Sequence, residues 1–105
     1  MTAKRVRTRV TAEAELREAI AYYLSDGADG AALRLIDEFE VALQAVGEYP
    51  AIGSAWLEAE LGIPGIRSFA LRAFPYVIVY VDTPDFVDVR HLLHSARDIP
   101  RRISE

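Results

Sequence analysis

The stretch that decides the fold is "GIRSFALRAFPYVIVYVDTPDFVDVRHLL", residues 65–93. It contains three runs with strand character, which the turn sequences "AFP" and "DTPD" separate. The first and third runs alternate between apolar and polar residues, as strands with one buried face do. The middle run, "YVIVYV", is apolar on both faces, which is typical of a central strand. The stretch therefore predicts a three-stranded antiparallel meander.

A fourth strand is predicted near the N-terminus, in "KRVRTRV", residues 4–10. Apolar or small side chains alternate there with arginines: Val6, Thr8 and Val10 against Arg5, Arg7 and Arg9. One face of this strand would be buried, and the other would carry the arginine row. The row could meet an acidic partner or a phosphate backbone, or it could be a solvated edge that resists aggregation.

Two amphipathic helices are predicted between this strand and the meander, with Thr11 and Asp29 as their N-caps. Their apolar stripes comprise Leu16, Ala19, Ile20, Tyr23 and Leu24 in the first helix, and Ala32, Leu35, Ile36, Phe39, Ala42, Leu43 and Val46 in the second. The short polar turn "SDGADG" joins them, so they should form an antiparallel hairpin. The following segment, residues 49–65, should pack down through its apolar side chains, which are Trp56, Leu57 and Leu61.

The predicted order is β-α-α-β-β-β, which is an α+β fold in a single domain spanning residues 1–105. There is no cysteine, so disulfides and thiolate metal sites are excluded, and a reducing cytoplasm is the expected location. The basic N-terminus lacks the apolar run of a signal peptide. The longest apolar run, residues 76–81, suits a strand, so no membrane association is expected.

The formal net charge is −4, which disfavours direct binding to nucleic acid. Metal binding is also not expected, because His91 and His94 stand three positions apart on a strand and so face opposite sides. The "GIPG" segment has neither the spacing nor the lysine of a phosphate loop. No cofactor is therefore predicted.

The segment "HLLHSARDIP", residues 91–100, allows two interpretations. RNA cleavage needs a base, an acid and a cation, and His94 could act as base or acid. The cations would be Arg67, Arg90 and Arg97. Alternatively, His94 satisfies backbone groups where the strand ends, and Arg97 and Asp98 pair or cap locally. The residues alone favour the local role.

The chain resembles the ParE/RelE superfamily of toxins from type II toxin–antitoxin systems. The resemblance lies in the element order and in "AELREAIAYY", "YPAIG", "GIRSFALRAFPYVIVYV" and "VRHLLHSARDIP", taken in that order. It implies an antitoxin whose C-terminal segment wraps the toxin. It also implies one of two activities, because RelE-like members cut mRNA on the ribosome and ParE-like members poison DNA gyrase.

Several departures from the RelE-like pattern favour the ParE branch. The chain is acidic overall, the segment 51–65 has no basic residue, and nothing aromatic follows Phe86. The resemblance therefore implies a gyrase inhibitor that catalyses nothing, with nucleic acid reached only through the antitoxin. The alternatives are a ribosome-dependent endoribonuclease and a non-toxic member that acts only in operon autoregulation. The residues expected to bind partners are Arg67, Arg72, Tyr80, Arg90, His94 and Arg97.

Overall fold

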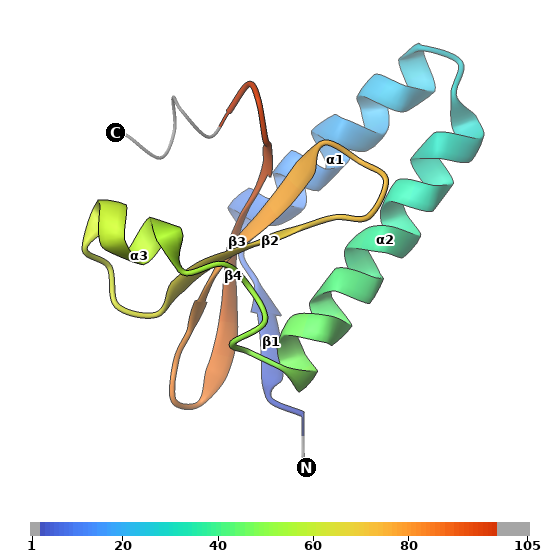
Figure 1. The fold of residues 1–105 in the computed structure, drawn as a ribbon. Helices are drawn as coiled ribbons and strands as arrows, with labels where there is room; N and C mark the ends of the chain where they lie inside the picture. The colour runs from blue at the N-terminus through green and yellow to red at the C-terminus, as the bar shows by residue number, and fades with distance from the viewer. Residues whose placement is uncertain (1–2, 99–105) are drawn as a thin grey trace.

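The computed structural model describes residues 3–98 as a sheet between helices (Figure 1). The elements are β1 (Arg5–Thr8), α1 (Val10–Ser25), α2 (Asp29–Glu48), α3 (Trp56–Leu61), β2 (Ile66–Ala70), β3 (Tyr76–Asp82) and β4 (Phe86–His94). The helices α1 and α2 form a hairpin on one side of the sheet, and α3 lies on the other (Figure 1). The predicted α+β order is confirmed, with α3 as an additional short helix in the linking segment.

The sheet has the order β1-β4-β3-β2. The meander β2-β3-β4 is antiparallel as predicted, whereas β1 pairs with β4 in parallel. The last strand is thus flanked by the first strand of the chain, and β1 and β2 form the two edges. The ammonium of Lys4 bonds Asp82 at 2.7 Å, which anchors the start of β1 to the β3–β4 connection.

The helix starts differ from the sequence prediction. The first helix begins at Val10, directly after the N-cap position Arg9, so Thr11 already lies inside it. The reason is that the β1–β4 ladder continues to Arg9, whose backbone N–H donates to the Val89 carbonyl at 2.9 Å. Asp29 is likewise the first residue of α2, and its side chain does not cap the helix.

Two apolar clusters fill the molecule. The larger lies between the sheet and the hairpin and contains Leu35, Phe39, Val46, Ile78, Tyr80, Val87, Val89 and Leu92, among others. The smaller lies on the opposite face of the sheet, where fully buried Leu57 of α3 packs with Ile66, Val79, Val81 and Leu93. The segment 49–65 packs down as expected through Leu57, although Trp56 remains 48% exposed.

A register shift between β3 and β4 changes which face each residue of β4 occupies. Tyr80 pairs with Val89 and Val79 pairs with His91, so Arg90 is the extra residue of a β-bulge. As a result, Leu92 lies in the larger cluster and Leu93 in the smaller one. The uninterrupted alternation predicted for "FVDVRHLL" is wrong, because the bulge exchanges the two faces beyond Val89.

Candidate functional site

A hollow of about 400 Å³ lies between α1 and the end of β4. Acidic, aromatic and basic side chains line it: Glu15, Glu18, Ala19, Tyr22, Tyr76, Leu92, Arg97 and Asp98. The α1 residues recur at positions i, i+3, i+4 and i+7, which places them on one helix face. This face lies beside the predicted apolar stripe, so the hollow unites two segments far apart in the sequence.

The carboxylate of Glu15 bonds to β4 on the side where β1 no longer pairs with it. Since β1 ends opposite Val89, β4 continues past it without a strand partner on that side. Glu15 is buried and accepts a hydrogen bond from the Leu92 backbone N–H at 3.1 Å. Its carboxylate also accepts from Nδ1 of His91 at 3.2 Å. The helix α1 is therefore tied to β4 through a charged side chain.

His94 stabilises the turn that follows β4. Its Nδ1 accepts hydrogen bonds from the backbone N–H groups of Ala96 at 3.3 Å and Arg97 at 3.1 Å. A nitrogen that accepts hydrogen bonds carries no proton, so this arrangement uses Nδ1 as the acceptor and leaves Nε2 as the nitrogen that can donate. The ring stands edge-on to Tyr76, with centroids 5.4 Å apart. One of the two ring nitrogens of His94 is thus occupied by hydrogen bonds from the chain's own backbone.

Arg97 and Asp98 complete this turn. Nε of Arg97 lies 3.0 Å from Oδ1 of Asp98, and the hydrogen bond raises the pKa of the arginine further. Asp98 also accepts from the His94 backbone N–H at 2.9 Å. The predicted local contacts of these residues, namely hydrogen bonds with backbone groups and the pairing of Arg97 with Asp98, are present in the structure. The Arg97 side chain is nevertheless 60% exposed, so it remains accessible to a partner.

Tyr80 is a core residue rather than a surface contact, which corrects its place among the predicted partner-binding residues. Its side chain is fully buried. Its hydroxyl donates to the Pro50 carbonyl at 2.7 Å and accepts from the Gly53 N–H at 2.9 Å. Burial raises the pKa of this phenol. Both hydrogen bonds hold the segment that follows α2, and a partner cannot reach the ring.

Arg67 also binds the segment that follows α2. Its Nη1 donates to the Gly53 carbonyl at 2.9 Å, and Ala51 offers a second carbonyl at 3.4 Å. The guanidinium is partly buried by these contacts and lies at the β2 edge of the sheet. Arg67 therefore positions the chain between α2 and α3.

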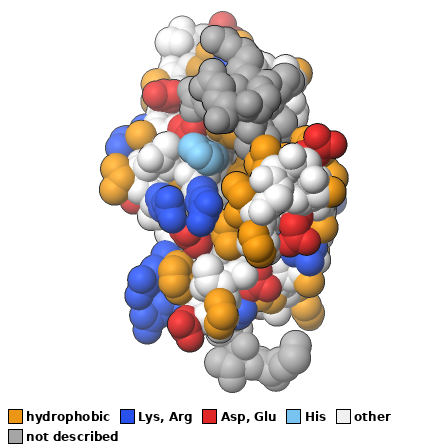
Figure 2. Space-filling view, turned by 90° about the vertical axis from the view of Figure 1, so that its left-hand side faces the viewer, with side chains coloured by type: hydrophobic (Ala, Val, Ile, Leu, Met, Phe, Trp, Pro, Cys, Tyr) orange, Lys and Arg blue, Asp and Glu red, His pale blue; other side chains and the backbone are white. Residues whose placement is uncertain are grey.

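Arg90 belongs to a different cluster, on the face of the sheet that carries α3. The buried carboxylate of Asp88 binds Arg90 at 3.2 Å and Arg9 at 2.8 Å. Basic side chains gather along one side of this face, with a histidine above them (Figure 2). One carboxylate thus holds two guanidinium groups, which leaves an excess of positive charge.

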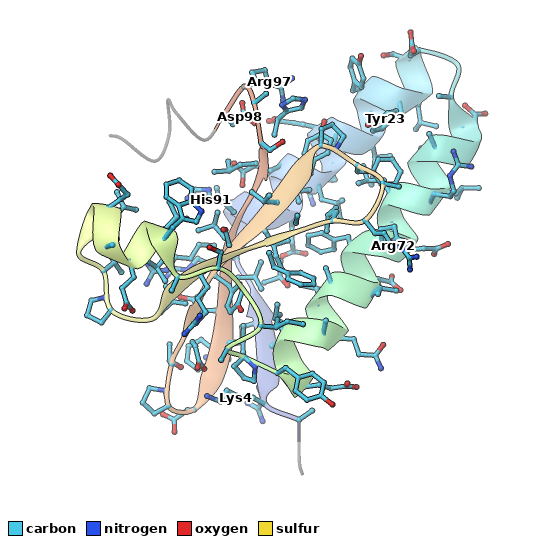
Figure 3. The ribbon with its side chains drawn as sticks, in the orientation of Figure 1. Lys4, Tyr23, Arg72, His91, Arg97 and Asp98 are labelled. Carbon is cyan, nitrogen blue, oxygen red and sulfur yellow. The ribbon has the colours of Figure 1, made fainter. Side chains whose placement is uncertain are left out.

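The structure does not gather the four residues of the nuclease alternative. His94 and Arg97 are adjacent, but Arg90 lies four residues back along β4, or about 13 Å at the rise of a strand. Arg67 is also distant from His94. Its partner in the sheet is Tyr80, whereas the partner of His94 is Tyr76, four residues away along β3. The other predicted contact, Arg72, lies next to α2 and apart from Arg97 and Asp98 (Figure 3).

Sequence reasoning missed Glu15, Glu18 and Tyr22, which line the hollow. Their spacing on α1 was the available signal, although nothing local shows that this face meets β4. Across residues 3–98, no group of three metal-ligating side chains comes together. Within the same range, no helix is long and apolar enough to cross a membrane.

Comparisons with known proteins agree with this architecture. The family model described as "ParE toxin of type II toxin-antitoxin system, parDE" matches residues 6–99. A Sinorhizobium fredii protein named "Putative toxin Y4kP" is 32% identical over 101 residues, covering 96% of this chain and 98% of the relative. The solved "Chromosomal ParDE TA system from P. aeruginosa" has the same fold, with a TM-score of 0.73 at 13% identity. The match covers 88% of this chain and 96% of that one. The chain therefore belongs to the ParE toxin family of type II toxin–antitoxin systems.

Proposed function

We propose that this toxin inhibits DNA gyrase through protein–protein contact in the cytoplasm and is neutralised by a cognate antitoxin. The observation that carries the proposal is that the four residues of the nuclease alternative are not assembled around one point. His94 bonds to the backbone N–H of Arg97 within the turn after β4. Arg67 bonds to the Gly53 carbonyl and Arg90 pairs with Asp88. An acid–base site needs its groups assembled around one reacting atom. The separated arginines suit binding, and Arg72, Arg90 and Arg97 are the contacts proposed for partners.

The hollow between α2 and the end of β2 supports an antitoxin contact. It has a volume of about 140 Å³ and a mainly apolar lining, which includes Val41, Ala42, Ala45, Phe69, Ala70 and Leu71. Val41 is 58% exposed, and Glu38 and Arg72 stand at the rim. An amphipathic helix that lays its apolar face in such a groove covers surface that this small core leaves exposed.

The test is to express the toxin without antitoxin and to assay supercoiling by purified gyrase together with cleavage of ribosome-bound mRNA. The expected result is loss of supercoiling with intact mRNA, and restored supercoiling when antitoxin is added. Arg97→Ala should weaken inhibition, whereas Arg34→Ala, which removes an exposed cation from α2, serves as the matched control.

Two results would contradict the proposal. Cut mRNA with unimpaired gyrase would instead support the ribosome-dependent endoribonuclease. Growth without any defect, with both gyrase and mRNA unaffected, would support a member that acts only with its antitoxin on the operon.

A further inference from the structure

The helix α3 covers only part of the sheet face on which it lies. Its buried Leu57 packs with apolar side chains of β2, β3 and the end of β4, which are Ile66, Val79, Val81 and Leu93. Further along the same face, Asp88 pairs with Val81 on one side and with Arg7 on the other. Paired residues of neighbouring strands share a face, so β1 and the first half of β4 present polar side chains beside α3. Basic side chains gather there next to hydrophobic ones (Figure 2).

The carboxylate of Asp88 orders two guanidinium groups in this part of the face. Arg9 donates from Nε to one carboxylate oxygen at 3.0 Å and from Nη2 to the other at 2.8 Å, which is a two-point contact. Nε of Arg90 donates to the second oxygen at 3.2 Å. The Asp88 side chain is only 8% exposed, whereas those of Arg9 and Arg90 are 55% and 31% exposed. The carboxylate is therefore buried beneath the two guanidinium groups, which remain accessible.

Arg7 adds a third cation to this face. Its guanidinium carbon stands 4.6 Å from the centroid of the Phe86 ring. A guanidinium that stacks on a ring keeps its N–H donors available at its rim. Within residues 3–98, no carboxylate forms an ion pair with Arg7. The arginine cluster, namely Arg7, Arg9 and Arg90 with Asp88, thus carries three guanidinium groups and one carboxylate.

The charge of the arginine cluster restricts the partners that fit it. The chain as a whole has a net charge of −4, so the positive excess is local and opposite in sign to the rest of the molecule. A DNA duplex, charged along its whole length, would also meet the acidic remainder of the chain. A second copy of this chain would bring like charges together. A protein surface with a few carboxylates matches the cluster without either repulsion, and guanidinium groups that are already ordered lose less entropy on binding.

We propose that the arginine cluster binds a carboxylate-bearing surface of gyrase and supplies the electrostatic part of the contact with the target. That the acidic partner is gyrase rests on the proposed function. The hollow proposed for the antitoxin lies against α2, on the side of the sheet that carries the helical hairpin (Figure 1). The two partners therefore use separate surfaces, and variants of the cluster should affect gyrase alone.

Binding of the toxin to immobilised gyrase holoenzyme tests the proposal. The association rate of the parent toxin should fall as the salt concentration rises from roughly 50 mM to roughly 300 mM. Arg7→Glu reverses a charge while leaving the ion pairs of Asp88 intact, and it should lower the affinity for gyrase about tenfold or more. Arg90→Gln should also lower the affinity, and both variants should flatten the salt dependence. Arg34→Glu, which alters an exposed arginine on α2, is the matched control and should change neither quantity.

The same variants are compared for folding and for binding to the cognate antitoxin. Their circular dichroism spectra should match that of the parent. Their affinity for the antitoxin should also be unchanged, because the cluster lies on the other side of the sheet from the hollow beside α2.

Unchanged affinity for gyrase in Arg7→Glu and Arg90→Gln would overturn the proposal. Weakened antitoxin binding with unchanged gyrase binding would also overturn it and would make the antitoxin the partner of the cluster. Binding of a labelled DNA duplex of about 20 base pairs, abolished by Arg7→Glu, would assign the cluster to nucleic acid instead. If the parent toxin does not bind gyrase, this inference and the proposed function both fail. Gyrase binding that the variants leave unchanged refutes this inference alone.

Discussion

At the scale of single residues, the Tyr80 hydroxyl joins the sheet to the segment after α2. It is buried between the Pro50 carbonyl and the Gly53 N–H. A Cβ on Gly53 would lie 2.6 Å from this oxygen, so the site accepts only glycine at position 53 without rearrangement. The phenol and the glycine therefore depend on each other, and the contact spans 27 positions of the sequence.

Tyr80→Phe should lower the free energy of unfolding by about 1–3 kcal/mol, because the buried Gly53 N–H and the partly buried Pro50 carbonyl lose their partner. Urea denaturation measures the change. Tyr22→Phe, at a tyrosine that is 60% exposed, is the control and should have little effect. Equal stability of the Tyr80 variant and the parent would show that water replaces the hydroxyl.

His94 tests whether the end of β4 has a structural role or a chemical one. In His94→Gln, the amide oxygen can accept from the backbone N–H groups of Ala96 and Arg97 in place of Nδ1. Growth inhibition should persist, with a loss of about 1–2 kcal/mol in unfolding free energy. Loss of toxicity with an intact fold and intact antitoxin binding would support the nuclease alternative instead.

At the scale of elements, β4 depends on α1 as well as on its neighbour strands. The pairing with β1 stops at Val89. The next β4 backbone N–H on that side belongs to Leu92, and it donates a hydrogen bond to the carboxylate of Glu15. The β-bulge at Arg90 falls at the same point, where the strand changes its partner. The end of β4 is therefore positioned by a side chain from a helix 77 positions earlier.

Glu15→Ala should destabilise the fold by about 1–3 kcal/mol, since it leaves the buried Leu92 N–H unpaired. It should also speed amide exchange at Leu92 more than at Ile78 in the adjacent strand β3. Glu18→Ala, one turn along α1 and exposed, is the matched control. If both variants exchange alike at Leu92, the helix does not hold the strand.

At the scale of the whole molecule, two buried phenols make stability fall at alkaline pH. Burial raises the pKa of Tyr76 and of Tyr80 above the ordinary 10.0. Above about pH 10, the unfolded chain releases protons that the folded chain retains, so the free energy of unfolding decreases as pH rises. Their contribution is fully present below pH 10 and is lost as pH rises through the raised values.

Urea-unfolding free energies between about pH 9 and pH 11.5 measure this loss. Tyr76→Phe should flatten the decline, because one of the two shifted groups is absent. Tyr22→Phe, at an exposed position, should leave the slope unchanged. A parent protein whose stability stays constant over this range would contradict the cause assigned to these shifts.

The sequence by itself determined the type and order of the main elements. Period-2 alternation and helical spacing are local properties, so the four strands and the helical hairpin followed from residues within each segment. The local contacts of His94, Arg97 and Asp98 likewise needed only neighbouring residues. The resemblance to the ParE/RelE superfamily rested on four segments taken in their order along the chain.

Only the tertiary structure decided the parallel pairing of β1 with β4, the bulge at Arg90 and the burial of Tyr80. It also decided that Arg67, Arg90 and His94 lie apart and that Glu15 meets Leu92. These features arise from contacts between segments that are distant along the chain. The pattern within one segment shows that a face is buried. Which other segment covers that face depends on packing between parts of the chain that are far apart in the sequence.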